Sequence, residues 1–119
     1  MKKAYYLATC DTCRRILKLL DLDDSWTLRE IKKEPISAKE LAEMRALSGS
    51  YEELLNRRAK IYKEMNLKEK SLSEEMIKEL ILREYTFLKR PVFVLGQNIF
   101  IGNSKENIET LVAAIASSQ

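Results

Sequence analysis

The sequence predicts an α/β fold with a mixed four-stranded sheet, built from a β-α-β unit, a helical insertion and a β-β-α unit. Three observations predict this fold class. A short apolar run at the amino end is followed at once by two cysteines and a helical pattern. The middle of the chain, at about 37–85, carries helical patterns alone. Beyond Pro91 the pattern returns to two short strands and a last helix.

The predicted β-α-β unit occupies the first 30 residues. Residues 4–7 are apolar, and residues 12–21 follow with apolar side chains at helical spacing. After a polar break at 22–24, residues 25–30 alternate between apolar and polar side chains, which is typical of a strand. We therefore expect two strands joined by one helix.

Capping sequences divide the predicted helical insertion. Residues 37–40 and 50–53 are both capping boxes, and Gly49 ends the helix between them. Behind the second box we expect a further helical region, carried by Leu54, Leu55, Ile61 and Met65. Residues 71–74 begin another helix, with a predicted core face of Met76, Ile77, Leu80 and Ile81.

The carboxyl-terminal part predicts a β-hairpin and a helix. The hairpin spans 92–101 with a turn at 96–98, and residues 103–106 cap a helix with the core face Ile108, Leu111, Val112 and Ile115. This order, with Cys-x-x-Cys after the first strand and a proline before the third, is the plan of a thioredoxin-like fold in one domain, 1–119. We expect the Arg90–Pro91 bond to be cis and the proline turn to face Cys10.

The composition excludes several classes of function. The 119 residues are enough for one domain with a buried core, and a net charge of +3 arises from 21 basic and 18 acidic residues interspersed along the chain. So mild a charge predicts no direct binding of nucleic acid. The apolar runs are too short for a membrane span or a secretory signal. We expect a cytoplasmic protein and a monomer.

The cysteine pair, Cys10 and Cys13, has three interpretations. The two residues could be ordinary buried thiols. They could bind zinc, but a structural zinc site needs about four ligands, and this chain has two cysteines and no histidine, so we expect no metal. The spacing favours a redox pair, in which one thiolate attacks and the nearby thiol resolves the mixed disulfide. A cysteine hydrolase with a histidine base is excluded.

Cys10 is the stronger nucleophile candidate. A strand, a tight loop and a helix start place it at or just before a helix N-terminus, whose N–H groups and positive dipole end favour an anion. Such surroundings lower a thiol pKa from about 8.5 to roughly 3.5–7.5. Arg90 precedes the proline turn, where a guanidinium stabilises a thiolate or binds an anionic group. We expect Arg58 to line the site too, and Arg15 and Arg57 to be surface charges.

Four segments together resemble the ArsC/Spx/YffB family: residues 10–14 (CDTCR), 56–64 (NRRAKIYKE), 88–92 (LKRPV) and 101–103 (IGN). The resemblance covers essentially the whole chain, in order and at the expected spacing. It implies a catalytic or redox cysteine at Cys10, and arginines at Arg58 and Arg90 that help to bind an oxyanion or a thiol substrate. The other residues expected to bind substrate are Thr9, Asp11, Thr12 and Pro91.

Three branches of this family differ at recognisable positions. The Cys-Asp-Thr triplet at 10–12 is like the YffB branch of glutathione-dependent thiol reductases, which this chain resembles most. Arsenate reductases carry a third arginine just after the last hairpin, where this chain has Asn103. The Cys-x-x-Cys spacing is like Spx, a redox-sensing regulator that binds the RNA polymerase alpha subunit.

The leading hypothesis is a thiol-disulfide oxidoreductase in which Cys10 attacks and Cys13 resolves. Its substrate is expected to be a small thiol or an oxyanion. We expect no bound cofactor, and glutathione or a dithiol protein such as glutaredoxin or thioredoxin as reductant. Arsenate reduction is the first alternative. The second is an Spx-like regulator, in which the cysteine pair is only a switch.

Overall fold

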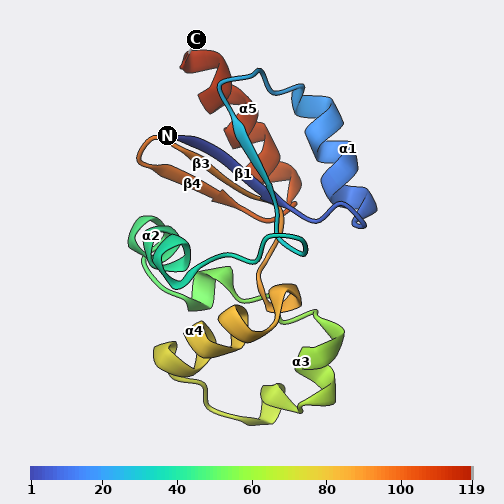
Figure 1. The fold of residues 1–119 in the computed structure, drawn as a ribbon, viewed down its shortest axis with the longest axis vertical. Helices are drawn as coiled ribbons and strands as arrows, with labels where there is room; N and C mark the ends of the chain where they lie inside the picture. The colour runs from blue at the N-terminus through green and yellow to red at the C-terminus, as the bar shows by residue number, and fades with distance from the viewer. Residues whose placement is uncertain (119) are drawn as a thin grey trace. The chain divides into compact units, whose positions relative to one another are not determined.

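The computed structural model describes residues 1–118, which fall into two compact units (Figure 1). The first unit comprises Met1–Glu34 together with the chain from Arg90 on. The second unit is Pro35–Lys89, which contains the predicted insertion at about 37–85.

The first unit contains a mixed four-stranded sheet with the strand order β2-β1-β3-β4, and the predicted fold class is confirmed. Its strands are β1 (Lys2–Tyr6), β2 (Thr27–Glu30), β3 (Val92–Leu95) and β4 (Asn98–Ile101). β1 pairs in parallel with β2 and antiparallel with β3, which in turn pairs antiparallel with β4. The parallel pair requires a crossover connection, and helix α1 (Asp11–Leu20) supplies it.

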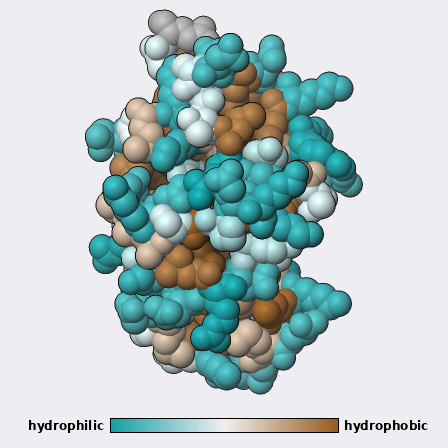
Figure 2. All heavy atoms as spheres, in the orientation of Figure 1, coloured by the Kyte–Doolittle hydropathy of each residue, from teal (hydrophilic) through white to brown (hydrophobic). Residues whose placement is uncertain are grey.

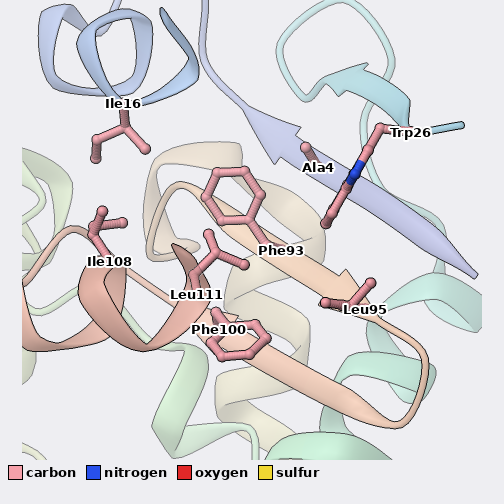
Figure 3. Close-up of a cluster of buried hydrophobic side chains, with 8 residues drawn as sticks. All are labelled: Ala4, Ile16, Trp26, Phe93, Leu95, Phe100, Ile108 and Leu111. Carbon is pink, nitrogen blue, oxygen red and sulfur yellow. The ribbon is translucent and has the colours of Figure 1, made fainter. Parts of the chain in front are cut away.

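Helices α1 and α5 (Lys105–Ser117) pack against one face of this sheet (Figure 1). Figure 3 shows Ile16 of α1 and Leu111 of α5 directed towards Phe93 of the sheet. Trp26, just before β2, meets the Phe93 ring edge-on, with the ring centroids 6.2 Å apart. The buried cluster comprises Ala4, Ile16, Trp26, Phe93, Leu95, Phe100, Ile108 and Leu111. Burial of each large apolar side chain contributes about 1.5–3 kcal/mol, which fixes α1 on the sheet.

The second unit is helical. Helix α2 begins with the predicted capping box: Ser37 Oγ accepts from the Glu40 N–H at 3.0 Å, and Glu40 Oε1 accepts from the Ser37 N–H at 2.9 Å. Gly49, at φ 96°, ends α2 in the left-handed conformation that glycine adopts at no steric cost. The helices are α2 (Ala38–Ser48), α3 (Lys60–Glu64) and α4 (Glu74–Arg83), with the 3₁₀ turns η1 (Glu52–Leu54), η2 (Leu67–Glu69) and η3 (Tyr85–Phe87).

The expected helical region over 54–65 is only partly confirmed, because α3 and the end of η1 are helical and the residues between them are not. Leu55 is extended and forms an isolated antiparallel bridge with Leu88. The Asn56 N–H donates to the Phe87 carbonyl at 2.7 Å beside this bridge. Leu54 and Leu55 are both fully buried, and long-range pairing therefore outweighs the local helical preference here.

Two side chains predicted to face the core are exposed. Met76 and Val112 have exposed fractions of 47% and 46%. Met76 and Val112 each stand next to a buried residue, Ile77 and Leu111 respectively. Each of the predicted core faces of α4 and α5 therefore includes one residue that is exposed.

The face of the molecule seen in Figure 2 is mainly hydrophilic, with smaller hydrophobic areas between the polar side chains. In the part of the chain that the structure describes, every helix is too short or too polar to cross a membrane.

Candidate active site at Cys10

The loop between β1 and α1 positions Cys10. The Cys10 N–H donates to the Leu7 carbonyl at 3.1 Å, which closes a turn over Ala8 and Thr9. Cys10 is then the N-cap residue of α1, in extended backbone conformation, and its carbonyl accepts from the Arg14 N–H at 3.1 Å. The predicted position of Cys10 at a helix N-terminus is confirmed.

Cys13 lies one turn inside α1 and is fully buried, whereas Cys10 is partly exposed. Both residues are free thiols in this structure. Burial, together with the hydrogen bond to Cys10 and the charge of the Cys10 thiolate, raises the pKa of Cys13 to about 11. A backbone hydrogen bond from Leu7 and the positive charge of Arg90 act in the opposite direction. Cys13 therefore stays a neutral thiol at neutral pH.

Opposing effects act on Cys10, and their net result is a lowered pKa. Burial raises the pKa of Cys10, whereas the Cys13 N–H, the Cys13 thiol, the charge of Arg90 and the Thr12 N–H all lower it. The neutral Cys10 thiol makes no conventional N-cap hydrogen bond. The thiolate is a much stronger acceptor, and these N–H groups at the start of the helix therefore favour the ionised form.

Arg90 and Pro91 lie in the segment just before β3. The Arg90–Pro91 bond is cis, as predicted. Pro91 is fully buried, and its carbonyl accepts from the Gly102 N–H at 2.8 Å, which fixes the segment to the end of the hairpin. Arg90 is half-buried with its Nε atom inside, and its charge lowers the pKa of both cysteines. Arg90 is thus an electrostatic part of the site.

The remaining loop residues are more exposed. Thr9 and Asp11 are exposed, and Asp11 forms an ion pair with Arg14 one turn along α1. Thr12 is half-buried and offers its N–H to Cys10. The structure therefore brings Thr12 to the thiol, while substrate binding by these three residues stays a prediction.

Arg58 belongs to the second unit. Its side chain is exposed, and its N–H donates to Asn56 Oδ1 at 3.1 Å. Asn103, just after β4, is also exposed. The predicted role of Arg58 at the site stays a prediction.

Glu30 is a neighbour of the cysteine loop that the sequence reasoning missed. Its Oε2 accepts from the Ala8 N–H at 2.7 Å, inside the turn that leads to Cys10. A signal was available, because the parallel strands of a β-α-β unit end at the same edge of a sheet. The last residue of the second strand is therefore placed beside the loop after the first.

The residues that the structure describes contain no group of three His, Cys, Asp or Glu side chains placed to hold a metal ion. The reactive groups at this edge are the two thiols, and the guanidinium of Arg90 supplies the nearby positive charge.

A thioredoxin-like sheet with two cysteines at the start of its first helix defines a class of thiol-bearing proteins. Residues 5–111 match the model of the ArsC family, and the chain belongs to that family. The predicted family is thereby confirmed.

Relatives of this chain include the global transcriptional regulator Spx of Listeria innocua, which is 26% identical over 110 residues, covering 91% of this chain and 84% of the relative. Among solved structures, a YffB protein is 24% identical with a TM-score of 0.77, covering 96% of this chain and 98% of that one. An arsenate reductase from Vibrio cholerae is 20% identical with a TM-score of 0.71, covering 92% and 94%. These two structural likenesses show the fold alone.

Proposed function

We propose that this chain is a thiol-disulfide oxidoreductase, with Cys10 as the nucleophile and Cys13 as the resolving thiol. The arrangement of the two free thiols carries the proposal. Cys10 is partly exposed at the N-cap of α1, within the field of Arg90, and Cys13 is buried one turn behind it. An incoming substrate has access to Cys10, while the buried Cys13 is placed to react with Cys10.

In the first step, the Cys10 thiolate attacks one sulfur of a disulfide substrate. A new S–S bond joins Cys10 to that sulfur, the substrate S–S bond breaks, and the departing thiolate takes a proton from water. The lowered pKa of Cys10 increases the fraction of this thiol that is ionised and able to attack. The charge of Arg90 favours that thiolate and attracts an anionic group on the substrate.

In the second step, Cys13 attacks the Sγ of Cys10. The Cys10–Cys13 disulfide forms, and the bound half of the substrate leaves as a thiol with the proton that Cys13 gives up. Burial is the largest influence on the high pKa of Cys13, but the Cys10 thiolate adds to it through its charge and its hydrogen bond. The charge of the thiolate and the hydrogen bond to it are both lost once Cys10 is in the mixed disulfide. The pKa of Cys13 then falls, so resolution follows attack.

The oxidised protein must regain two electrons and two protons. Two glutathione molecules supply them on becoming one glutathione disulfide, and a dithiol protein such as glutaredoxin or thioredoxin supplies them in one exchange. This chemistry needs no bound cofactor and suits the cytoplasm, where such thiols are kept reduced. The family resemblance supports substrate binding by Arg58 and Arg90, and we propose that Thr9, Asp11, Thr12 and Pro91 contribute to it as well.

Mass spectrometry of the protein treated with glutathione disulfide tests the proposal. The wild type should lose two hydrogens as the Cys10–Cys13 disulfide forms, and Cys13→Ser should retain one glutathione on Cys10. Cys10→Ser is the matched control and should stay unmodified at neutral pH. A wild-type protein that remains fully reduced, or that carries glutathione on Cys13, contradicts the proposal.

An Spx-like regulator is the second candidate, because Spx of Listeria innocua is similar over most of this chain. A regulator of this kind would retain the RNA polymerase alpha subunit in a pull-down when oxidised, release it on reduction, and show no turnover of disulfides.

Arsenate reduction is the third candidate, since Arg90 places positive charge near the thiolate. Asn103 stands where the resemblance to arsenate reductases implies a third arginine. Arsenate-dependent oxidation of thiols that is lost in Cys10→Ser would favour this activity.

A further inference from the structure

We propose that Glu30 is a positioning residue for Cys10, an inference that rests on Cys10 being the reacting thiol of the proposed function. Glu30 is the last residue of β2, and the parallel register sets it opposite Tyr6, the last residue of β1. Its side chain therefore lies at the sheet edge where the cysteine loop begins.

The two carboxylate oxygens of Glu30 bind backbone from two different loops. Oε2 accepts from the Ala8 N–H at 2.7 Å, in the loop after β1. Oε1 accepts from the N–H groups of Lys32 and Lys33 at 2.6 Å and 2.9 Å, in the loop after β2. Hydrogen bonds to an ionised acceptor are short and about twice as strong as neutral ones. One side chain thus ties the cysteine loop to its neighbour.

The Ala8 contact acts directly on the turn that delivers Cys10. Ala8 is a central residue of the turn closed by the bond from the Cys10 N–H to the Leu7 carbonyl. The ladder between the two strands ends just before it, where the Ile31 N–H donates to the Tyr6 carbonyl at 3.0 Å. Glu30 therefore continues the connection between the strands beyond the point where backbone pairing stops.

The position of this turn sets the surroundings of the Cys10 sulfur. The Cys10 pKa depends on how close the sulfur lies to the N–H groups of Thr12 and Cys13 and to Arg90. A turn that drifts away from Glu30 carries Cys10 with it and weakens these interactions. Loss of the Glu30 contact should therefore raise the pKa of Cys10.

A purely electrostatic role for Glu30 predicts the opposite sign. A nearby carboxylate disfavours a thiolate, so removal of its charge would lower the pKa of Cys10. The direction of the change in Glu30→Gln therefore separates positioning from charge. Glu30→Asp adds a second test, because it keeps the charge but is one methylene too short to hold both loops.

The experiment measures the pH dependence of Cys10 alkylation by iodoacetamide in the full-length chain, with Cys10 and Cys13 peptides resolved by mass spectrometry. Glu30→Gln and Glu30→Asp should both slow alkylation of Cys10 below its pKa by about three- to tenfold, which is a rise of roughly half a unit to one unit in pKa. Glu34→Gln is the matched control, because Glu34 is exposed and its carboxylate lies 3.5 Å from Arg29. It should leave the profile unchanged.

Trp26 fluorescence verifies that each variant is folded, because Trp26 is the one tryptophan of the chain and is buried against Phe93. An unchanged Cys10 pKa in the folded Glu30→Asp protein, or a lower one in Glu30→Gln, overturns the positioning role alone. A wild-type Cys10 pKa equal to that of free cysteine overturns the proposed function, and this inference with it.

Discussion

The buried Cys13 thiol donates a hydrogen bond to the Sγ of Cys10. Burial is the largest influence on both thiols and raises the pKa of each. The shared hydrogen bond separates them, because it lowers the pKa of Cys10 and raises that of Cys13, which stands at about 11. Two titratable groups whose surroundings move their pKa values apart have distinct chemical roles. The lowered pKa suits Cys10 to the role of attacking thiolate, and the raised pKa keeps Cys13 a neutral thiol until Cys10 has reacted.

Substitution of Cys13 should separate its role as a donor from its role as a resolving thiol. Cys13→Ala removes the hydrogen bond, and the pKa of Cys10 should rise by about half a unit. Cys13→Ser keeps a hydroxyl donor, so the pKa of Cys10 should stay low. Neither variant can form the internal disulfide, and both should accumulate a glutathione adduct on Cys10 after treatment with glutathione disulfide. Alkylation profiles and intact mass check this prediction, and equal Cys10 pKa values in the two variants contradict it.

Arg90 should stabilise the Cys10 thiolate through its charge. Arg90→Met removes the charge but keeps an apolar stem, and the pKa of Cys10 should rise. Arg90→Lys keeps a positive charge and should retain most of the effect on pKa. The difference in Cys10 pKa between Arg90→Met and the wild type should become smaller at high salt, because salt partly screens the attraction between Arg90 and the thiolate. The same Cys10 alkylation profile in Arg90→Met and the wild type would exclude this role.

Glu30 should make the stability of the fold depend on pH. Burial raises its pKa, but hydrogen bonds from the N–H groups of Ala8, Lys33 and Lys32 outweigh burial and hold the pKa of Glu30 below its usual value. Because the folded pKa lies below the unfolded value of about 4.3, the ionised carboxylate stabilises the fold above that pH. This contribution is lost as pH falls through the folded pKa.

Glu30→Gln should therefore be less stable than the wild type at neutral pH, and the difference should shrink as the pH falls below about 4. Urea denaturation of both proteins across this range measures the change. A difference in the free energy of unfolding that is the same at neutral and acid pH would show that the ionised form of Glu30 is not the stabilising one.

Phe93 should dominate the core of the first unit, because it is fully buried and contacts Trp26. Phe93→Ala should lower the free energy of unfolding by about 3–5 kcal/mol and alter the fluorescence of Trp26. Val112→Ala is the control, since Val112 is 46% exposed and its truncation should change stability by no more than about 0.5 kcal/mol. Chemical denaturation followed by fluorescence measures both variants, and similar losses in the two would contradict this view of the core.

The features predicted correctly from the sequence depend on local patterns. The helix start at Cys10, the capping box at Ser37 and the hairpin after Pro91 each follow from residues close together in the chain. The cis bond at Arg90–Pro91 was expected from the order of the elements, which places this proline before the third strand of a thioredoxin-like plan, and an X–Pro bond adopts this form at low cost.

The features that were missed depend on contacts between distant segments. Leu55 pairs with Leu88, 33 positions away, and no periodicity around Leu55 reveals this bridge. The carboxylate of Glu74, the first residue of α4, accepts from the Tyr51 N–H at 2.7 Å and so links the start of η1 to α4. Glu30 is a similar case, because its contact with Ala8 requires the parallel register of β1 and β2.

The pH dependence of Cys10 alkylation in the wild type tests the central claim most directly. We predict an apparent Cys10 pKa below the value of about 8.5 for a free cysteine, with alkylation of Cys13 requiring a higher pH than alkylation of Cys10. A Cys10 pKa at or above the free value, or equal reactivity of Cys10 and Cys13 across the range, would contradict the assignment of Cys10 as the attacking thiolate.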